Sequence, residues 1–424
     1  MESRVKVDQL QPGVFIQLEN SWFSHPFFFN KFKIKNQEQI RTLKALGIED
    51  IAWIPERSDC LPKTLQEVSP EVGKEKPKAG HQEEDPYLQL LWQVKKDRIS
   101  KLQEKRECLR RCTSNYDKTV KHIPNLMAQM LAGSKDAIKG AQVITEALVK
   151  VFLGDMDALV HLINVKDKGE GIYHHSLNVS VLSLMLGKKA ELTEAEMNCL
   201  GMGALFHDIG KNRIDKKILR KTPPYTKSEL EIIQRHPQWG VEIVSRGGAF
   251  AEEATRVILQ HHEQCNGEGY PQHLKGDQID KLARITTIVN SYDNLCNHID
   301  PEKCMTPYQA LSFMYTKLQN HLDMELFSLF IRSLGIYPPG TVVRLSNGVI
   351  GIVVSINPQN PLKPSLMLYD PKIPKEEALF FEMEDDTDVT IETSIQPEKL
   401  PNEVRRYLCP STGTNYFVES SRSR

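Results

Sequence analysis

The sequence has no apolar run near the roughly 18 residues that a membrane-spanning helix needs. It also lacks the basic start and short apolar stretch of a secretory signal peptide. Its 54 Lys and Arg residues nearly balance its 55 Asp and Glu residues, so no overall field attracts the chain to a membrane or a nucleic acid polymer. We therefore expect a cytoplasmic protein that binds neither.

The cysteines are few and scattered. None of the eight shows Cys-x-x-Cys spacing, which excludes a zinc ribbon and gives no sign of a disulfide framework. At 424 residues the chain is too long for one compact core, and its apolar fraction of 40% indicates globular folding. We expect two or three domains with reduced thiols.

Residues 1–66 alternate short strands with a helix, which predicts a small α+β domain. A helix is expected through Ile40 and Leu46. Gly47 should close it, because glycine is favourable just beyond a helix end. Apolar and aromatic runs predict strands at residues 14–18, 28–34 and 50–54.

Charged residues, proline and glycine dominate residues 67–86, which predicts a flexible linker. Residues 87–137 follow as connecting helices. The first, residues 87–119, has one apolar face that could pair with a second subunit in a homodimer. Pro124 should break this helix, and a second one should run from residue 125 to residue 130.

From residue 138 to residue 335 the apolar pattern is helical, which predicts an all-α core. Residues 336–424 change to a period of two and predict a β-rich C-terminal appendage. Asn347-Gly348 between two apolar runs is a strong hairpin signal. The strands are expected at residues 341–345, 349–354 and 366–369. The predicted fold class is therefore mainly α, with a helical core between two small flanking parts.

An adjacent His207-Asp208 pair ends the apolar helical run within residues 200–211. Thr193 with Glu196 forms the pattern of a capping box, so we expect this helix to begin there. Burying a carboxylate costs several kcal/mol unless it is paired or binds a metal. The pair is therefore a candidate metal site.

Five other histidines lie in similar company: His174-His175, His236 and His261-His262. Imidazole and carboxylate together suit iron, manganese, zinc or nickel. More than four such ligands indicate two ions that share a bridging group. His174 is better explained as a neighbour of a ligand than as a ligand.

From about residue 138 to residue 340 the chain resembles an HD-GYP domain, a subfamily of the HD phosphohydrolases. The residues that carry the resemblance are His207-Asp208-Ile209-Gly210-Lys211, His236-Pro237, His261-His262-Glu263 and Gly269-Tyr270-Pro271. The beginning of the chain resembles a small domain of unknown function that often precedes HD-GYP domains. The resemblance implies a phosphodiesterase that hydrolyses cyclic di-GMP, a bacterial second messenger of biofilm formation and motility.

The resemblance also implies two divalent ions, iron first, with manganese or nickel as alternatives. Their ligands would be His175, His207, Asp208, His236, His261, His262 and Asn290. Asp208 would bridge the ions. Asn290 stands where the family has Asp, and its amide brings no negative charge, so the first ion should bind more weakly. Asp293 could compensate as a ligand, or serve as a structural partner.

Catalysis would involve Asp208 and Lys211, whose ammonium would contact the phosphate or protonate the leaving oxygen. A lysine that interacts with a helix dipole is the plainer alternative. A glycine-rich loop would shape the pocket and contact a GGDEF-domain partner, through Gly267, Gly269, Tyr270 and Pro271. The basic residues that many relatives use for the phosphates are missing, and the candidates to replace them are Arg213, Arg284 and Lys303.

Three functions stay open at this point. The first is hydrolysis of cyclic di-GMP to pGpG and then GMP. The second is a catalytically impaired HD-GYP module that binds cyclic di-GMP or a GGDEF protein as a regulator. The third is a phosphohydrolase that acts on another nucleotide.

Overall fold

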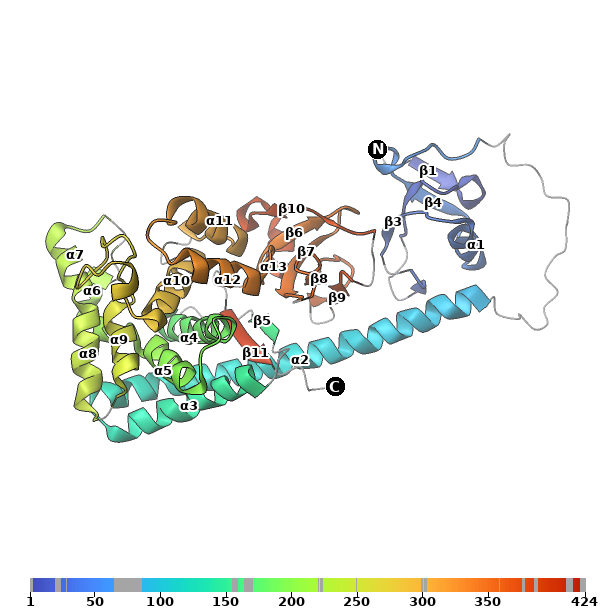
Figure 1. Ribbon diagram of the computed structural model, residues 1–424. Coiled ribbons are helices and arrows are strands. Elements are labelled where there is room, and N and C mark those ends of the chain that lie inside the picture. The colour runs from blue at the N-terminus through green and yellow to red at the C-terminus, as the bar shows by residue number, and fades with distance from the viewer. Residues whose placement is uncertain are drawn as a thin grey trace. The chain divides into compact units, whose positions relative to one another are not determined.

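The computed structural model describes residues 3–19, 24–27, 29–64, 86–154, 159–163, 171–219, 221, 224–248, 250–298, 300, 303–357, 359–375, 378–384, 388–408 and 415–419 (Figure 1). They form two compact units. The N-terminal unit comprises Met1–Arg106, Arg344–Ile350 and Asp370–Leu379, and the helical unit comprises Glu107–Val343, Gly351–Tyr369 and Phe380–Arg424. The predicted linker, apart from Pro86, lies outside the described residues.

A four-stranded antiparallel sheet of order β1-β4-β2-β3 organises the N-terminal unit. Its elements are β1 (Ser3–Lys6), η1 (Val7–Gln9), β2 (Phe15–Gln17), β3 (Lys31–Lys33), α1 (Gln37–Ala45), β4 (Asp50–Trp53) and η3 (Pro55–Arg57). Val14, Ile16 and Leu43 are fully buried between the sheet and α1. The predicted helix end is confirmed, because Gly47 has a φ of 71° just beyond α1.

Helix α2 (Pro86–Leu131) is continuous, so the predicted break at Pro124 is wrong. A proline inside a helix removes one backbone hydrogen bond and costs roughly 3 kcal/mol. Here the apolar side chains on both sides of Pro124 are buried in the core of the helical unit, among them Tyr116, Ile123 and Met130. Their burial outweighs the local cost and keeps the helix intact.

The helical unit contains α3 (Lys135–Gly154), α4 (Gly171–Lys189), α5 (Glu194–Phe206), η4 (Ile209–Arg213), α6 (Lys216–Leu219), α7 (Lys227–Gln234), α8 (His236–Arg246), α9 (Glu252–Gln260), η5 (Gly276–Gln278), α10 (Lys281–Cys296), α11 (Pro307–Lys317) and α12 (Met324–Leu334). The predicted capping box is confirmed at the start of α5, where the Thr193 hydroxyl accepts from the Glu196 amide. Among the described helices, none combines the length and apolar composition needed to cross a bilayer.

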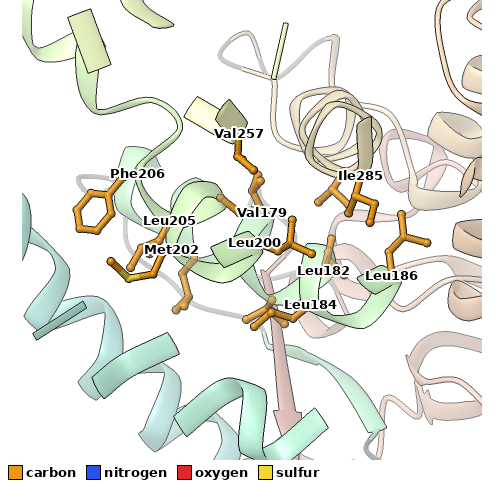
Figure 2. Packing of buried hydrophobic residues seen from close by; sticks show 14 of the residues in the cluster. Val179, Leu182, Leu184, Leu186, Leu200, Met202, Leu205, Phe206, Val257 and Ile285 are labelled. Carbon is orange, nitrogen blue, oxygen red and sulfur yellow. The ribbon is translucent and has the colours of Figure 1, made fainter. Parts of the chain in front are cut away.

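One apolar core lies between these helices. Figure 2 shows Val179 and Leu182 of α4, Leu200 of α5, Val257 of α9 and Ile285 of α10 as they converge. All five are fully buried. Full burial of one such side chain contributes about 1.5–3 kcal/mol. The core therefore fixes α4, α5, α9 and α10 relative to one another, and His175, His207 and His261 of the candidate site lie on these helices or directly after them.

A seven-stranded sheet of order β10-β6-β7-β5-β11, with β8 and β9 beyond β7, combines β5, which lies between α3 and α4, with strands that follow α12. Its strands are β5 (Leu159–Ile163), β6 (Val342–Leu345), β7 (Ile350–Ser355), β8 (Ser365–Leu368), β9 (Leu379–Glu382), β10 (Ile391–Ile395) and β11 (Asn415–Glu419), joined by η8 (Pro397–Lys399) and α13 (Asn402–Leu408). The Asn347-Gly348 hairpin is confirmed, since the Leu345 amide donates to the Val349 carbonyl at 2.9 Å.

The fold class is confirmed as a helical core with small β parts. One detail is wrong, because β5 places a strand inside the region predicted to be entirely helical. Its main partner is β11, with Leu159 opposite Glu419 and Ile163 opposite Asn415. A strand so short, paired with a segment about 250 positions away in the sequence, leaves no local periodic signal.

Candidate metal centre

The ends of several helices meet at one point of the helical unit. His207 directly follows Phe206, the last residue of α5, and Asp208 directly precedes η4. His236 begins α8, and His261 follows the last residue of α9. His175 lies within α4. Side chains that are up to 87 positions apart in the sequence, from His175 to His262, therefore share one site.

The first metal group consists of His175, His207 and Asp208. The Nε2 atoms of the two histidines are 3.2 Å apart. Asp208 Oδ2 lies 3.6 Å from His175 Nε2 and 3.4 Å from His207 Nε2. This spacing lets three donor atoms face one ion.

The second metal group consists of Asp208, His236, His261 and His262, and one donor atom from each lies within 4.8 Å of the others. Asp208 Oδ1 is 3.3 Å from His236 Nε2 and 3.7 Å from His261 Nε2. Each oxygen of Asp208 thus faces a different group. The structure brings together six of the seven predicted ligands and places the carboxylate between them.

Backbone carbonyls fix the rings of three of these histidines. The Nδ1 atoms of His207, His236 and His261 each donate to the carbonyl three positions earlier, at 2.7 Å to Ala204, 2.7 Å to Ile233 and 2.8 Å to Ile258. A ring that donates through Nδ1 when neutral presents a lone pair at Nε2. His236 and His261 then point two lone pairs at each other across 3.2 Å.

A cation between these lone pairs would replace repulsion with coordination, and a hydrogen bond from the opposite ring nitrogen is the usual support for a metal-bound histidine. Two buried atoms that lack a hydrogen-bond partner in the described part of the chain support a cation at this place. Among the described residues, Asp208 Oδ1 and His262 Nε2 have no hydrogen-bond partner. The residues present therefore fit divalent metal ions of the type that imidazole and carboxylate bind.

The electrostatics leave these side chains in their ligating forms. Burial lowers the pKa of His207, lowers that of His261 to about 3, and holds that of His262 well below its usual value. Burial alone would raise the pKa of Asp208, but Lys211 and His207 outweigh it and hold that pKa well below its usual range. Neutral imidazoles and an ionised carboxylate are the forms that bind metals.

Lys211 lies beside the carboxylate, with Nζ 2.5 Å from Asp208 Oδ2. Its turn, η4, packs directly on α8 because Gly210 has no side chain. A Cβ atom at Gly210 would lie 1.9 Å from the His236 carbonyl oxygen. The close approach brings Asp208 and His236 together.

His175 is oriented differently, by a carboxylate from another helix. Its Nδ1 donates to Asp293 Oδ2 at 2.7 Å. Asp293 Oδ1 accepts from Asn178 at 3.1 Å and from Asn297 at 3.0 Å. Asp293 is thus a partner of a candidate ligand. The sequence indicated Asp293 as a ligand or a structural partner but gave no sign of the two asparagines, although Asn178 follows His175 by three positions on α4.

Asn290 is buried on α10, 3% exposed. Its Oδ1 accepts a hydrogen bond from Asn294 Nδ2 at 2.7 Å. The side chain therefore points an oxygen at another amide on its own helix. Its role as a metal ligand remains a prediction.

The glycine-rich loop lies against the second metal group. The Tyr270 ring stacks on His262 with 4.6 Å between ring centroids, and its amide donates to the His262 carbonyl at 3.1 Å. Glu263, which the sequence indicated only as part of the His261-His262-Glu263 motif, is buried and accepts from the amides of Gln272 and Leu274. This carboxylate fixes the loop. Gly267 and Gly269 allow its turn, and Tyr270-Pro271 is a cis peptide.

The three basic residues proposed for the phosphates each pair with carboxylates outside the metal groups. Arg213 pairs with Glu242, Arg284 with Asp323 at 2.8 Å and Asp277 at 3.2 Å, and Lys303 with Asp300 at 3.8 Å. Within the described residues, Lys211 is the lysine that contacts the cluster. A phosphate contact by the other three remains a prediction.

Two protein families match parts of this chain. A domain of unknown function, DUF3391, matches residues 2–141, and the HD domain matches residues 157–326. A cyclic di-GMP phosphodiesterase of Pseudomonas aeruginosa is 27% identical over 380 residues, which cover 87% of this chain and 85% of that protein. A 3′3′-cGAMP-specific phosphodiesterase of Vibrio cholerae is 29% identical over 164 residues, 39% of this chain and 35% of that protein.

A solved structure, that of an HDG"Y"P protein from Bdellovibrio bacteriovorus, covers 78% of this chain and 98% of its own. Its TM-score is 0.45 and its sequence identity is 15%.

Proposed function

Because this chain carries an HD domain at residues 157–326, preceded by a DUF3391 domain, we propose that it is a metal-dependent phosphodiesterase that hydrolyses cyclic di-GMP to pGpG and then to GMP. The observation that carries the proposal is the convergence of five imidazoles on the two oxygens of Asp208. The relatives support it, since those compared above are named as phosphodiesterases of cyclic dinucleotides.

We assign two divalent ions, iron first, to the two metal groups, with Asp208 shared between them. When bound, such ions lower the pKa of water and offset the charge that develops on phosphoryl oxygens. Lys211 lies beside Asp208 Oδ2, the oxygen that faces the first metal group. Its ammonium would add a positive charge there and stabilise the phosphate through an N–H donor. The buried histidines keep the ligand set rigid, which limits reorganisation during the reaction.

The glycine-rich loop would form one wall of the substrate site. Tyr270 covers the ring of His262, so its phenol face borders the second metal group and can exclude water from that side. We further propose residues 267–271 as a contact for a GGDEF-domain partner and residues 87–119 as a homodimer contact. Co-purification of this chain with a GGDEF domain tests the first proposal, and light scattering of this chain alone tests the second.

A second candidate is a catalytically impaired module that binds cyclic di-GMP as a regulator. The observation that favours it is Asn290, which contributes no charge to the first metal group and already accepts from Asn294. Binding without hydrolysis would follow if that group failed to hold its ion.

Anaerobic loading with Fe(II) or Mn(II), followed by incubation with cyclic di-GMP, separates these candidates. We expect pGpG and then GMP by liquid chromatography. Binding of cyclic di-GMP with no product under either metal would favour the regulator. Comparable or faster hydrolysis of 3′3′-cGAMP in a parallel reaction would redirect the proposal to another cyclic dinucleotide.

A further inference from the structure

A row of buried polar side chains leads from α2 to His175. It begins with Tyr116, which is fully buried on α2. The Tyr116 hydroxyl lies 2.9 Å from His174 Nδ1 and 3.4 Å from Asn178 Oδ1. Its ring stacks on His174, with 5.5 Å between centroids and 18° between planes. The tyrosine is therefore held in place by both packing and hydrogen bonds.

Asn178 continues the row with the other end of its amide. Its Nδ2 donates to Asp293 Oδ1 at 3.1 Å, and Asp293 Oδ2 accepts from His175 Nδ1 at 2.7 Å. The ionised carboxylate of Asp293 only accepts, so it selects the amide orientation that points Nδ2 towards it. The Tyr116 hydroxyl, 3.4 Å from Oδ1, then holds the other end of the amide in place.

Asp293 has no exposed surface and accepts hydrogen bonds from His175, Asn178 and Asn297. A buried carboxylate depends strongly on its donors, because an unsatisfied charged group costs more than an ordinary lost hydrogen bond. Loss of one donor would let the carboxylate turn away from His175. The imidazole would then lose the acceptor that aims its Nε2 at the first metal group.

We propose that Tyr116 and Asn178 are positioning residues for the first metal group, and that α2 sets the orientation of His175 through them. The proposal rests on the metal-binding function proposed above. It concerns one group, because the rings of His207, His236 and His261 are oriented by carbonyls of their own segments. A shift of α2 that withdraws Tyr116 would therefore weaken one ion and spare the other.

The position of Tyr116 on α2 would connect the long helix to the first metal group. Residues of α2 up to Arg106 belong to the N-terminal unit, and those from Glu107 onward belong to the helical unit. A signal that displaces or rotates this helix would act on metal binding through Tyr116, with no need to reach the substrate site itself.

The test uses the full chain with Tyr116→Phe and Asn178→Ala, and Tyr292→Phe as the matched control. Tyr292 is also fully buried, but its hydroxyl interacts with Cys296 on α10. Chelator competition with Mn(II) gives the dissociation constants of both ions, and the visible spectrum of the Co(II) protein reports the ligand geometry. Urea unfolding of the metal-free variants shows how much stability each has lost.

We expect Tyr116→Phe to weaken one ion about tenfold, within the 10–100-fold range usual for groups that support a ligand. Asn178→Ala should weaken the same ion further, and Tyr292→Phe should change neither constant. Wild-type constants in both Tyr116→Phe and Asn178→Ala would overturn the inference. If the wild-type protein binds two ions without hydrolysing cyclic di-GMP, the proposed catalysis fails while this comparison still decides the role of Tyr116.

Discussion

The two metal groups obtain their geometry in different ways. In the second metal group, His236 and His261 are fully buried and each donates to a carbonyl three positions earlier. In the first, His207 is held by a carbonyl in the same way, but His175 is 13% exposed and depends on Asp293 of another helix. Short segments therefore orient these ligands of the second group, whereas one ligand of the first depends on a contact between helices. The first group is the one that regulation or sequence change can alter most easily.

Replacing the carboxylate of Asp208, which both metal groups share, should remove the ions from both groups and so abolish the difference between them. For Asp208→Ala we expect loss of both ions and a fall in hydrolysis of roughly a thousandfold, because bound metal ions stabilise the transition state by several kcal/mol. Metal analysis after gel filtration and the rate of pGpG formation measure this. Asp136→Asn, an exposed carboxylate on α3, is the control. Retention of either ion at full occupancy would show that Asp208 is not shared.

Single histidine replacements should have unequal effects in the two groups. His175→Ala leaves two of the three donors that the structure brings together in the first metal group, and His261→Ala leaves three of four in the second. We expect the first variant to lose one ion and the second to keep both, with one bound roughly 100-fold more weakly. Metal content at increasing chelator concentration distinguishes them. Equal losses would mean that the two groups do not act as separate sites.

A negative charge in the first metal group should make the two halves more alike. We expect Asn290→Asp to strengthen binding of the first ion about tenfold, because the gain in attraction is partly offset by desolvation of the new carboxylate. Gln142→Glu adds the same charge at an exposed position of α3, and serves as the control. Unchanged occupancy in Asn290→Asp would show that residue 290 is not a ligand.

The sequence predicted well the parts of the site that depend on short segments. Thr193 marked the start of α5, and the His207-Asp208 pair marked its end, because capping and the cost of burying charge are local effects. His236 and His261 were found through the spacing of a family resemblance. Their convergence on one carboxylate then follows from how the helices pack.

Long-range contacts account for what the sequence did not disclose. Tyr116 lies 177 positions from Asp293, and nothing near Tyr116 in the sequence distinguishes it from a core tyrosine. Pro124 carried a strong local signal for a helix end, and burial of its neighbours reversed it. Strand β5 required a partner near the other end of the chain.

A buried histidine outside the site can be compared with the histidines of the metal groups, and its replacement has the smallest expected effect. His25 in the N-terminal unit is 1% exposed, and its Nε2 lies 2.8 Å from the Asn30 side-chain oxygen. Burial, with the charge of Lys95 nearby, lowers the pKa of His25 to about 4. Burial also lowers the pKa of Lys95 to about 7. This histidine sits beside an amide and an ammonium, whereas those of the metal groups surround a carboxylate.

Between pH 6.5 and pH 4 the unfolded chain protonates His25 while the folded chain does not, so unfolding takes up a proton and stability falls as the pH falls. We expect a loss of about 2 kcal/mol across this window, allowing for partial solvation. Lys95 does not contribute there, because its folded and unfolded forms are both charged below about pH 7. His25→Gln can still donate to Asn30 but does not titrate. Hydrogen exchange of β4 amides in the two proteins at matched pH measures the difference in stability. Parallel pH dependences would show that His25 is protonated in the folded state. Its burial would then not distinguish it from an ordinary surface histidine.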